Sequence, residues 1–197
     1  MKENNYEQTV PKKEAEKEVE MASRRIALLH LAYAKTLARE LGDEEGKKMV
    51  LKAIKYYGKL IGEKVRKDVQ VQGLEPTPDN YGAGKARNIP KYGMHEKREV
   101  FETEGRKRRR SFGCVLGKLW REYREEELGR LYCYVDLAKS MFYNPNFKLV
   151  HTKCMPERED EECEFDVLST TAEERKNFFS EEADWTTIDK GIDFDSQ

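Results

Sequence analysis

The spacing of apolar residues predicts two long helices in the first part of the chain. From about residue 16 to Leu41, apolar positions recur every three or four residues, as on one face of a helix. Gly42 is placed to end this helix, and Asp43 to cap a second one that runs to about Gln70. In that second helix Gly58 and Gly62 lie one turn apart, which predicts a smooth surface for close packing of another backbone.

The rest of the chain predicts short strands and helices. The long segment 73–94, rich in proline and glycine, is either a lid over a binding site or an ordered surface crossing. A turn is predicted at 144–146 and a charged turn at 156–161. The remaining elements are hairpin strands at 98–103 and 108–112 around Gly105, helices at 115–123 and 126–141, and strands at 147–154 and 162–168.

This order of elements predicts an α+β fold, with an N-terminal helical pair and an antiparallel sheet covered by helices. A chain of 197 residues fits one domain, which we place at 16–170. Residues 1–15 are expected to be a flexible charged lead-in, and 171–197 an acidic C-terminal tail. Three aromatic residues of the tail are candidates to pack against the body: Phe178, Phe179 and Trp185.

Composition and charge narrow the classes of function. The 37 basic and 38 acidic side chains nearly cancel, which argues against a nucleic-acid partner. No apolar run approaches the roughly 20 residues that span a bilayer, so no membrane association is expected. The charged N-terminus is unlike a secretory signal, and four cysteines then indicate thiols in a reducing, cytoplasmic setting. The glycine pair leaves a homo-oligomer open.

The thiols and one carboxylate are the candidate chemical groups. Cys133 and Asp136 lie three apart on the predicted helix 126–141, so they share a face. Cys114 falls where a strand gives way to a helix, and a helix N-terminus favours the reactive thiolate. The basic run 106–110 would lower the pKa of Cys114 further. The alternative is structural: the cysteines are small buried hydrophobic residues, and Asp136 caps a helix or forms a salt bridge.

Metal and cofactor signals are weak. No C-x₂-C or H-x₃-H pair occurs, so we expect no cofactor; zinc would need a site assembled from distant residues. Such a site would combine Cys114, Cys133 and Asp136 with His95 or His151. The basic run 106–110 is expected to be a salt-bridged surface, with one arginine available to a substrate carboxylate. Its alternative is a nucleic-acid or nuclear-targeting patch.

Several motifs taken together resemble one family. They are Glu127–Asp136 with its Tyr-Cys-x-x-Asp core, Tyr143–Asn146, Lys153–Pro156, Glu162–Phe165 with Cys-x-Phe, Cys114 followed by Trp120, and Leu74–Tyr81. This set is similar to the L-2-amino-thiazoline-4-carboxylic acid hydrolase family over about residues 22–167. The resemblance implies an enzyme that hydrolyses a small cyclic C=N carboxylate of the thiazoline type. An example is 2-amino-thiazoline-4-carboxylate, which would yield N-carbamoyl-cysteine.

The resemblance also implies roles for individual residues. Asp136 would be the base or the partner of the amidinium, and Cys114 a nucleophile or acid. Cys133 would complete the catalytic set and line the pocket. Substrate binding would fall to His95, Cys163 and Asn144. Two other functions stay open: a non-catalytic domain that binds or senses a small molecule, and an interaction module built on the basic run and the acidic tail.

Overall fold

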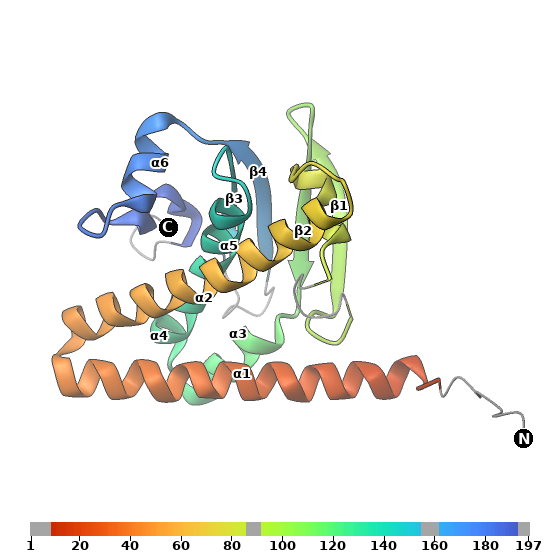
Figure 1. Ribbon diagram of the computed structural model, residues 1–197. Helices are drawn as coiled ribbons and strands as arrows, with labels where there is room; N and C mark the ends of the chain where they lie inside the picture. The colour runs from red at the N-terminus through yellow and green to blue at the C-terminus, as the bar shows by residue number, and fades with distance from the viewer. Residues whose placement is uncertain (1–8, 86–91, 155–161, 193–197) are drawn as a thin grey trace, which may run out of the picture.

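The computed structural model describes residues 9–85, 92–154 and 162–192. It confirms the α+β class, with an N-terminal helical pair and a four-stranded antiparallel sheet (Figure 1). The elements are α1 Lys12–Leu41, α2 Asp43–Val71, the 3₁₀ helix η1 Pro78–Ala83, β1 Lys97–Thr103, β2 Arg106–Phe112, α3 Val115–Tyr123, α4 Glu126–Arg130, η2 Leu131–Tyr134, α5 Val135–Tyr143, β3 Phe147–Cys154, β4 Cys163–Ser169, α6 Ala172–Phe179, η3 Trp185–Ile188 and η4 Lys190–Ile192.

The two long helices meet at Gly42. Its φ of 85° is a backbone conformation that residues with a Cβ rarely adopt. Gly42 also occupies the N-cap of α2, so the capping role predicted for Asp43 is wrong; Asp43 lies in the first turn. The start of α1 at Lys12 corrects the predicted lead-in 1–15, of which residues 1–8 lie outside the described part. Among the helices of the described residues, none has an apolar segment long enough to cross a bilayer.

The glycine pair of α2 is where α5 crosses it. A Cβ on Gly58 would lie 2.4 Å from the Cβ of Ala138, and one on Gly62 would lie 2.4 Å from the carbonyl oxygen of Lys139. The predicted close approach of another backbone is therefore confirmed, and the partner is α5. Because α5 also contacts β3, this crossing sets the distance between the helical pair and the sheet (Figure 1).

The single helix predicted over 126–141 is divided into α4, η2 and α5. Gly129 of α4 packs against the ring of Trp120, since a Cβ there would lie 2.2 Å from the indole. α5 is anchored instead on α2, through Gly58 and Gly62. The tighter 3₁₀ turn η2 joins two pieces that are held by different neighbours. As a result Cys133 lies in η2 and Asp136 in the first turn of α5.

The sheet has the order β1-β2-β4-β3, and its register collects polar groups and thiols on one face. A β-bulge between His151 and Lys153 shifts the alternation of β3, so that Cys154 shares the face of His151 although their separation is odd. By cross-strand pairing this face, hereafter the site face, carries Arg98, Arg109, Ser111, His151, Cys154, Cys163 and Phe165.

The opposite face of the sheet carries Arg106, Arg108 and Arg110 of the basic run. Arg106 and Arg108 both reach the buried Asp166, each with a nitrogen 3.1 Å from Oδ2. Arg110 Nη2 lies 2.6 Å from Glu164 Oε1, and its guanidinium stacks over Phe101. The predicted salt-bridged surface is confirmed for these three arginines. Arg109 points to the site face instead, as strand alternation requires.

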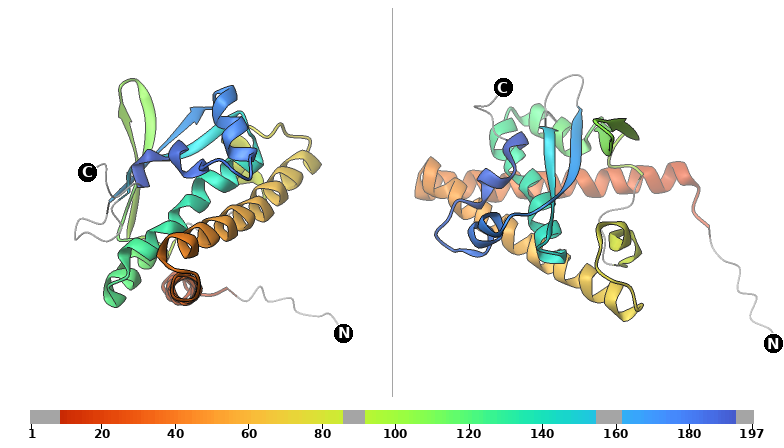
Figure 2. Two further views of the ribbon diagram at one scale, coloured as in Figure 1. Left: turned by 90° about the vertical axis from the view of Figure 1, so that its left-hand side faces the viewer. Right: turned by 90° about the horizontal axis from the view of Figure 1, so that it is seen from above.

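The described part of the C-terminal segment belongs to the hydrophobic core. Phe178, Trp185 and Ile192 are buried together with Tyr134 of η2, whereas Phe179 is half exposed. Tyr134 and Trp185 pack edge to face with ring centroids 5.7 Å apart. The expected packing of the tail's aromatic residues against the body is therefore confirmed for Phe178 and Trp185. α6, η3 and η4 pack beside β3 and α5 (Figure 2).

The α2–α5 crossing yields a stability prediction. Gly62→Ala should lower the free energy of unfolding by about 1–3 kcal/mol, because the new Cβ meets a backbone oxygen that cannot move aside. This cost exceeds the gain of about 1 kcal/mol in helix propensity. Urea denaturation measures the change, with Lys52→Ala on the exposed side of α2 as the control. A stabilised Gly62→Ala protein would contradict the crossing.

Candidate active site

Asp136 of α5 is the centre of a buried group of charges. One of its oxygens accepts a hydrogen bond from Lys139, one turn further along α5, whose side chain is buried. The other oxygen, Oδ2, lies 3.7 Å from Nε2 of His151 on the site face. Burial alone would raise the pKa of Asp136, but the charges of Lys139 and His151 outweigh it and lower that pKa. Asp136 is therefore a carboxylate at neutral pH.

His151 is held between two carboxylates. Its Nδ1–H donates to Oδ2 of Asp189 at 2.8 Å, and its backbone N–H donates to Oδ1 of the same residue at 2.9 Å. Burial lowers the pKa of His151, yet Asp189 and then Asp136 reverse this and raise it to about 10. The ring is consequently an imidazolium at neutral pH. Its Nε2–H faces Asp136 across a gap too long for a hydrogen bond.

His95 lies near the same charges, but unlike His151 it is neutral at neutral pH. Arg98 donates from Nη2 to His95 Nδ1 at 2.7 Å. Burial and the charge of Arg98 lower the pKa of His95 to about 4, although Asp136 acts in the other direction. The neutral ring accepts at Nδ1, so its proton is on Nε2 and this nitrogen is a donor. The segment before β1 thus brings the predicted substrate-binding residue His95 to the Asp136 group.

The four cysteines gather beside this group, and none forms a disulfide. Cys154 and Cys163 are cross-strand neighbours on the site face. The thiol of Cys154 is hydrogen-bonded to those of Cys133 and Cys163, which together with burial raises its pKa. Cys114 and Cys133 pack against the same apolar cluster. The structure therefore brings together the four thiols that lie far apart in the sequence.

The thiolate predicted for Cys114 is wrong. Cys114 is the N-cap of α3, and the backbone N–H groups of Leu116 and Gly117 favour its charged form. Burial and the neighbouring thiols of Cys163 and Cys133 act more strongly and raise the pKa of Cys114 to about 12. Cys114 is a neutral thiol at physiological pH, so it is a poor nucleophile in this state.

Tyr81 presents a donor that has nothing to bind within the described residues. Its hydroxyl is buried and lacks a hydrogen-bond partner there. The ring packs edge to face on Tyr143, with centroids 5.0 Å apart. Burial, followed by the negative charge of Asp136, raises the pKa of Tyr81, which therefore stays protonated. η1, within the segment that was predicted as a lid or a surface crossing, supplies this phenol.

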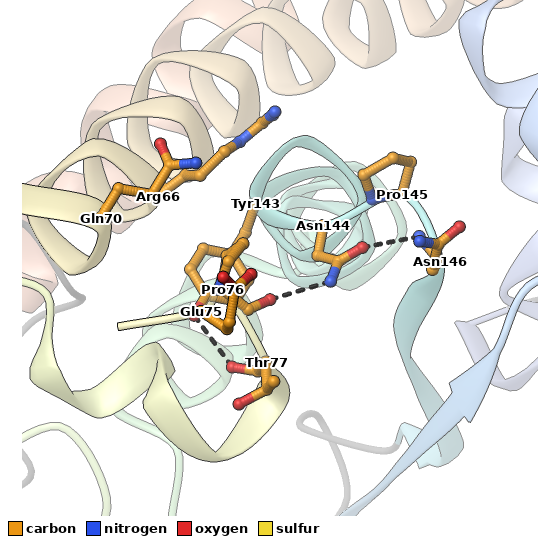
Figure 3. Close-up of a pocket in the computed structure, with 9 residues that line it drawn as sticks. All are labelled: Arg66, Gln70, Glu75, Pro76, Thr77, Tyr143, Asn144, Pro145 and Asn146. Carbon is orange, nitrogen blue, oxygen red and sulfur yellow. Dashed lines mark hydrogen bonds between the residues drawn. The ribbon is translucent and has the colours of Figure 1, made fainter. Parts of the chain in front are cut away.

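Asn144, a predicted substrate-binding residue, is the C-cap of α5, at the end of the helix away from Asp136. Its Nδ2 donates to the carbonyl of Pro76 at 2.8 Å, while its Oδ1 accepts from the backbone of Asn146 at 2.9 Å (Figure 3). Tyr143 similarly donates to the carbonyl of Thr77 at 2.9 Å. These bonds fasten the segment before η1 to α5. Asn144 anchors this loop to α5 and also lines a pocket, so its role in substrate binding stays a prediction.

A shallow pocket of about 290 Å³ surrounds Asn144 (Figure 3). Arg66 and Gln70 of α2 form one side, and the segment around Pro76 forms the other. The thiols and the Asp136 group do not line it. In the described part of the chain, no three His, Cys, Asp or Glu side chains have the arrangement of a metal-binding set.

Sequence reasoning missed several members of the Asp136 group. The spacing of Lys139 from Asp136, three residues along a helix, was a usable signal. His151 was considered only as a metal ligand. Asp189 carries no local signal, because it reaches the group from a segment distant in sequence. Tyr81 entered only as the last residue of the motif Leu74–Tyr81.

Comparisons with known proteins concern residues 21–167. A family model described as L-2-amino-thiazoline-4-carboxylic acid hydrolase matches this segment. Neither the curated proteins nor the solved structures give a match. The matched segment includes Asp136, His151 and the four cysteines, and it ends before Asp189.

The state of His151 predicts how stability depends on pH. The folded protein keeps a proton on His151 up to about pH 10, whereas the unfolded chain releases it near pH 6.5. The stabilisation is therefore complete below pH 6.5 and is lost as the pH rises toward 10. Urea denaturation at pH 6, 8 and 10 should show the deficit of His151→Gln relative to the wild type shrinking steadily. A deficit that grows with pH would mean that the buried ring is neutral.

Proposed function

We propose that this chain, which belongs to the L-2-amino-thiazoline-4-carboxylic acid hydrolase family, is a hydrolase that opens a small cyclic C=N carboxylate of the thiazoline type. The resemblance identified from the motifs is confirmed by the matched segment 21–167. The observation that supports the proposal most directly is the convergence of Asp136, Lys139 and His151 beside the neutral thiols. The substrate we propose is 2-amino-thiazoline-4-carboxylate, with N-carbamoyl-cysteine as the product.

The reaction needs water and no cofactor. Water adds to the ring carbon that is bonded to two nitrogens and to sulfur, and one of its protons passes to the ring nitrogen. The carbon–sulfur bond then breaks, the added hydroxyl becomes the carbonyl, and its proton compensates for the one that the departing sulfur takes up. Such a sequence requires a group that moves the proton of water, a donor to sulfur, and a cation for the carboxylate.

The charges of the group suit these tasks. Asp136 is the acceptor for the proton of water and passes it to the ring nitrogen. His151, an imidazolium with Nε2–H directed toward Asp136, donates to the departing sulfur and is reprotonated by the hydroxyl. Three cations (Lys139, Arg98 and the His151 ring) accompany the two carboxylates of Asp136 and Asp189. This excess of positive charge favours a substrate that carries a carboxylate.

The neutral groups complete the binding site in this proposal. Cys114, Cys133 and Cys163 form a wall of low polarity for the sulfur side of the ring. His95 Nε2–H and the Tyr81 hydroxyl are neutral donors for the substrate. Because Cys114 is protonated, the water attacks directly and no thioester-like covalent intermediate is formed.

The activity test is incubation of the purified protein with 2-amino-thiazoline-4-carboxylate, followed by measurement of released thiol. Asp136→Asn should reduce kcat by about 10²-fold or more, because the proton acceptor is lost. Cys114→Ser should retain turnover within about tenfold, since the residue only lines the site. Asp43→Asn, whose carboxylate is exposed on α2, is the matched control. Loss of turnover in Cys114→Ser would instead support a nucleophilic role for Cys114. Binding of the substrate without any thiol release would favour a sensing domain.

Tyr81→Phe separates substrate binding from folding. Removing a buried hydroxyl that has no partner in the described part of the chain should leave the free energy of unfolding unchanged or slightly higher. The same change should weaken substrate binding by about 1 kcal/mol or more, measured as KM or by calorimetry. Tyr143→Phe is the control with the opposite pattern, because it breaks the bond to the Thr77 carbonyl. A destabilised Tyr81→Phe protein would contradict the role of this phenol.

A further inference from the structure

The C-terminal segment reaches the Asp136 group from outside the region that matches the family. The match ends at residue 167, whereas Asp189 lies between η3 and η4. The backbone of this segment is nevertheless in direct contact with β3, since a Cβ on Gly191 would lie 1.9 Å from the carbonyl oxygen of His151.

The core holds Asp189 in place. Trp185 and Ile192, on either side of it in sequence, are buried in the main hydrophobic cluster. The N–H of Asp189 donates to the carbonyl of Thr186 at 3.0 Å. The Asp189 side chain is completely buried. A buried carboxylate is costly unless it is paired and hydrogen-bonded, and its partner here is His151.

The contact with His151 has two points, which fixes the orientation of the ring. One carboxylate oxygen accepts from the backbone N–H and the other from Nδ1–H. On the remaining sides the ring meets Phe165 of β4, with centroids 4.7 Å apart, and Asp136 of α5. Nδ1 is thus committed to Asp189, and only Nε2 can turn toward Asp136 and a substrate.

We propose that Asp189 is a positioning residue of the Asp136 group, and that the C-terminal segment is therefore a functional part of the site. Asp189 orients His151 and keeps it in the protonated form, which delivers a proton from Nε2. The part of this inference that concerns turnover rests on the proposed hydrolase activity. The part that concerns the orientation and protonation of the His151 ring does not depend on that activity.

The charges around the ring explain why Asp189 is needed. The titratable groups that face His151 are Asp189 from the C-terminal segment, Asp136 from α5 and Cys133 from η2. Cys133 contributes less than either carboxylate to the raised pKa of His151, and Asp136 shares its charge with Lys139. Without the Asp189 charge, burial would favour a neutral ring, and a neutral ring is free to carry its proton on either nitrogen.

The decisive measurement is the ¹⁵N NMR titration of the imidazole rings in the full-length protein. The chain has three histidines, and burial lowers the pKa of His30 and His95. At pH 8 we expect one imidazolium, assigned to His151 by its absence in His151→Gln, and two neutral rings. Asp189→Asn should lower the titration midpoint of His151 by about 1–3 pH units. The titration midpoint of His151 is measured in the wild-type protein, and His151→Gln serves only to assign the signal, so an unfolded Asp189→Asn protein would not leave the question open.

Activity gives the second readout. Asp189→Asn should reduce kcat on 2-amino-thiazoline-4-carboxylate by about 10²-fold with little change in KM, and should move the alkaline limit of the pH profile downward. Asp184→Asn is the matched control, because Asp184 belongs to the same segment and only caps η3. Circular dichroism checks that each variant is folded.

The outcomes separate the two proposals. A wild-type His151 that titrates near pH 6.5 overturns the role of Asp189, whatever the protein hydrolyses. A protonated His151 in a protein that releases no thiol upholds the positioning of the ring and overturns the proposed function. Full turnover in a folded Asp189→Asn protein, with a lowered midpoint, overturns the claim that the segment serves catalysis.

Discussion

The arrangement of this protein depends on a row of four buried or half-buried charges of alternating sign: Lys139, Asp136, His151 and Asp189. Taking any one of them out of water alone would cost several kcal/mol. In sequence order the row comes from α5, β3 and the C-terminal segment, so pairing the charges also fixes how these three elements meet. Removing one member would leave each neighbour in the row with one partner fewer in a buried environment, so each charge stabilises the next.

Two backbone features allow the row to form. The glycines of α2 let α5 approach so closely that no Cβ fits at Gly58 or Gly62, and this places Asp136 over the sheet. The bulge in β3 turns both His151 and Cys154 to the site face. Without the bulge, strand alternation would direct one of them to the salt-bridged face. The thiols and the charges are therefore adjacent because of backbone geometry, and neither group determines the position of the other.

The parts of the fold that could be predicted are those with local causes. Periodic apolar residues indicated α1 and α2, alternation indicated the strands, and Gly58 and Gly62 indicated a close crossing. The division of the predicted helix 126–141 has a tertiary cause, the separate anchoring of α4 and α5. Similarly, His151 and Asp189 are 38 residues apart, and their contact follows from the packing of the C-terminal segment. A pattern within one segment carries no information about such meetings.

The Cys114 thiol shows how a correct local argument gives a wrong chemical state. Its position at the N-terminus of α3 was predicted correctly, and that position does favour the thiolate. A helix terminus contributes about 0.3–1 kcal/mol, which is less than one pKa unit. Burial and the neighbouring thiols of Cys163 and Cys133 oppose it more strongly, so the pKa of Cys114 rises to about 12. For His151 the balance is reversed, because two carboxylates face a buried ring and outweigh desolvation. Whether a buried group is charged is thus decided by its partners across the fold, and those partners belong to other elements. His151 is charged because Asp189 and Asp136 face its ring, whereas burial and the neighbouring thiols raise the pKa of Cys114 and of Cys154.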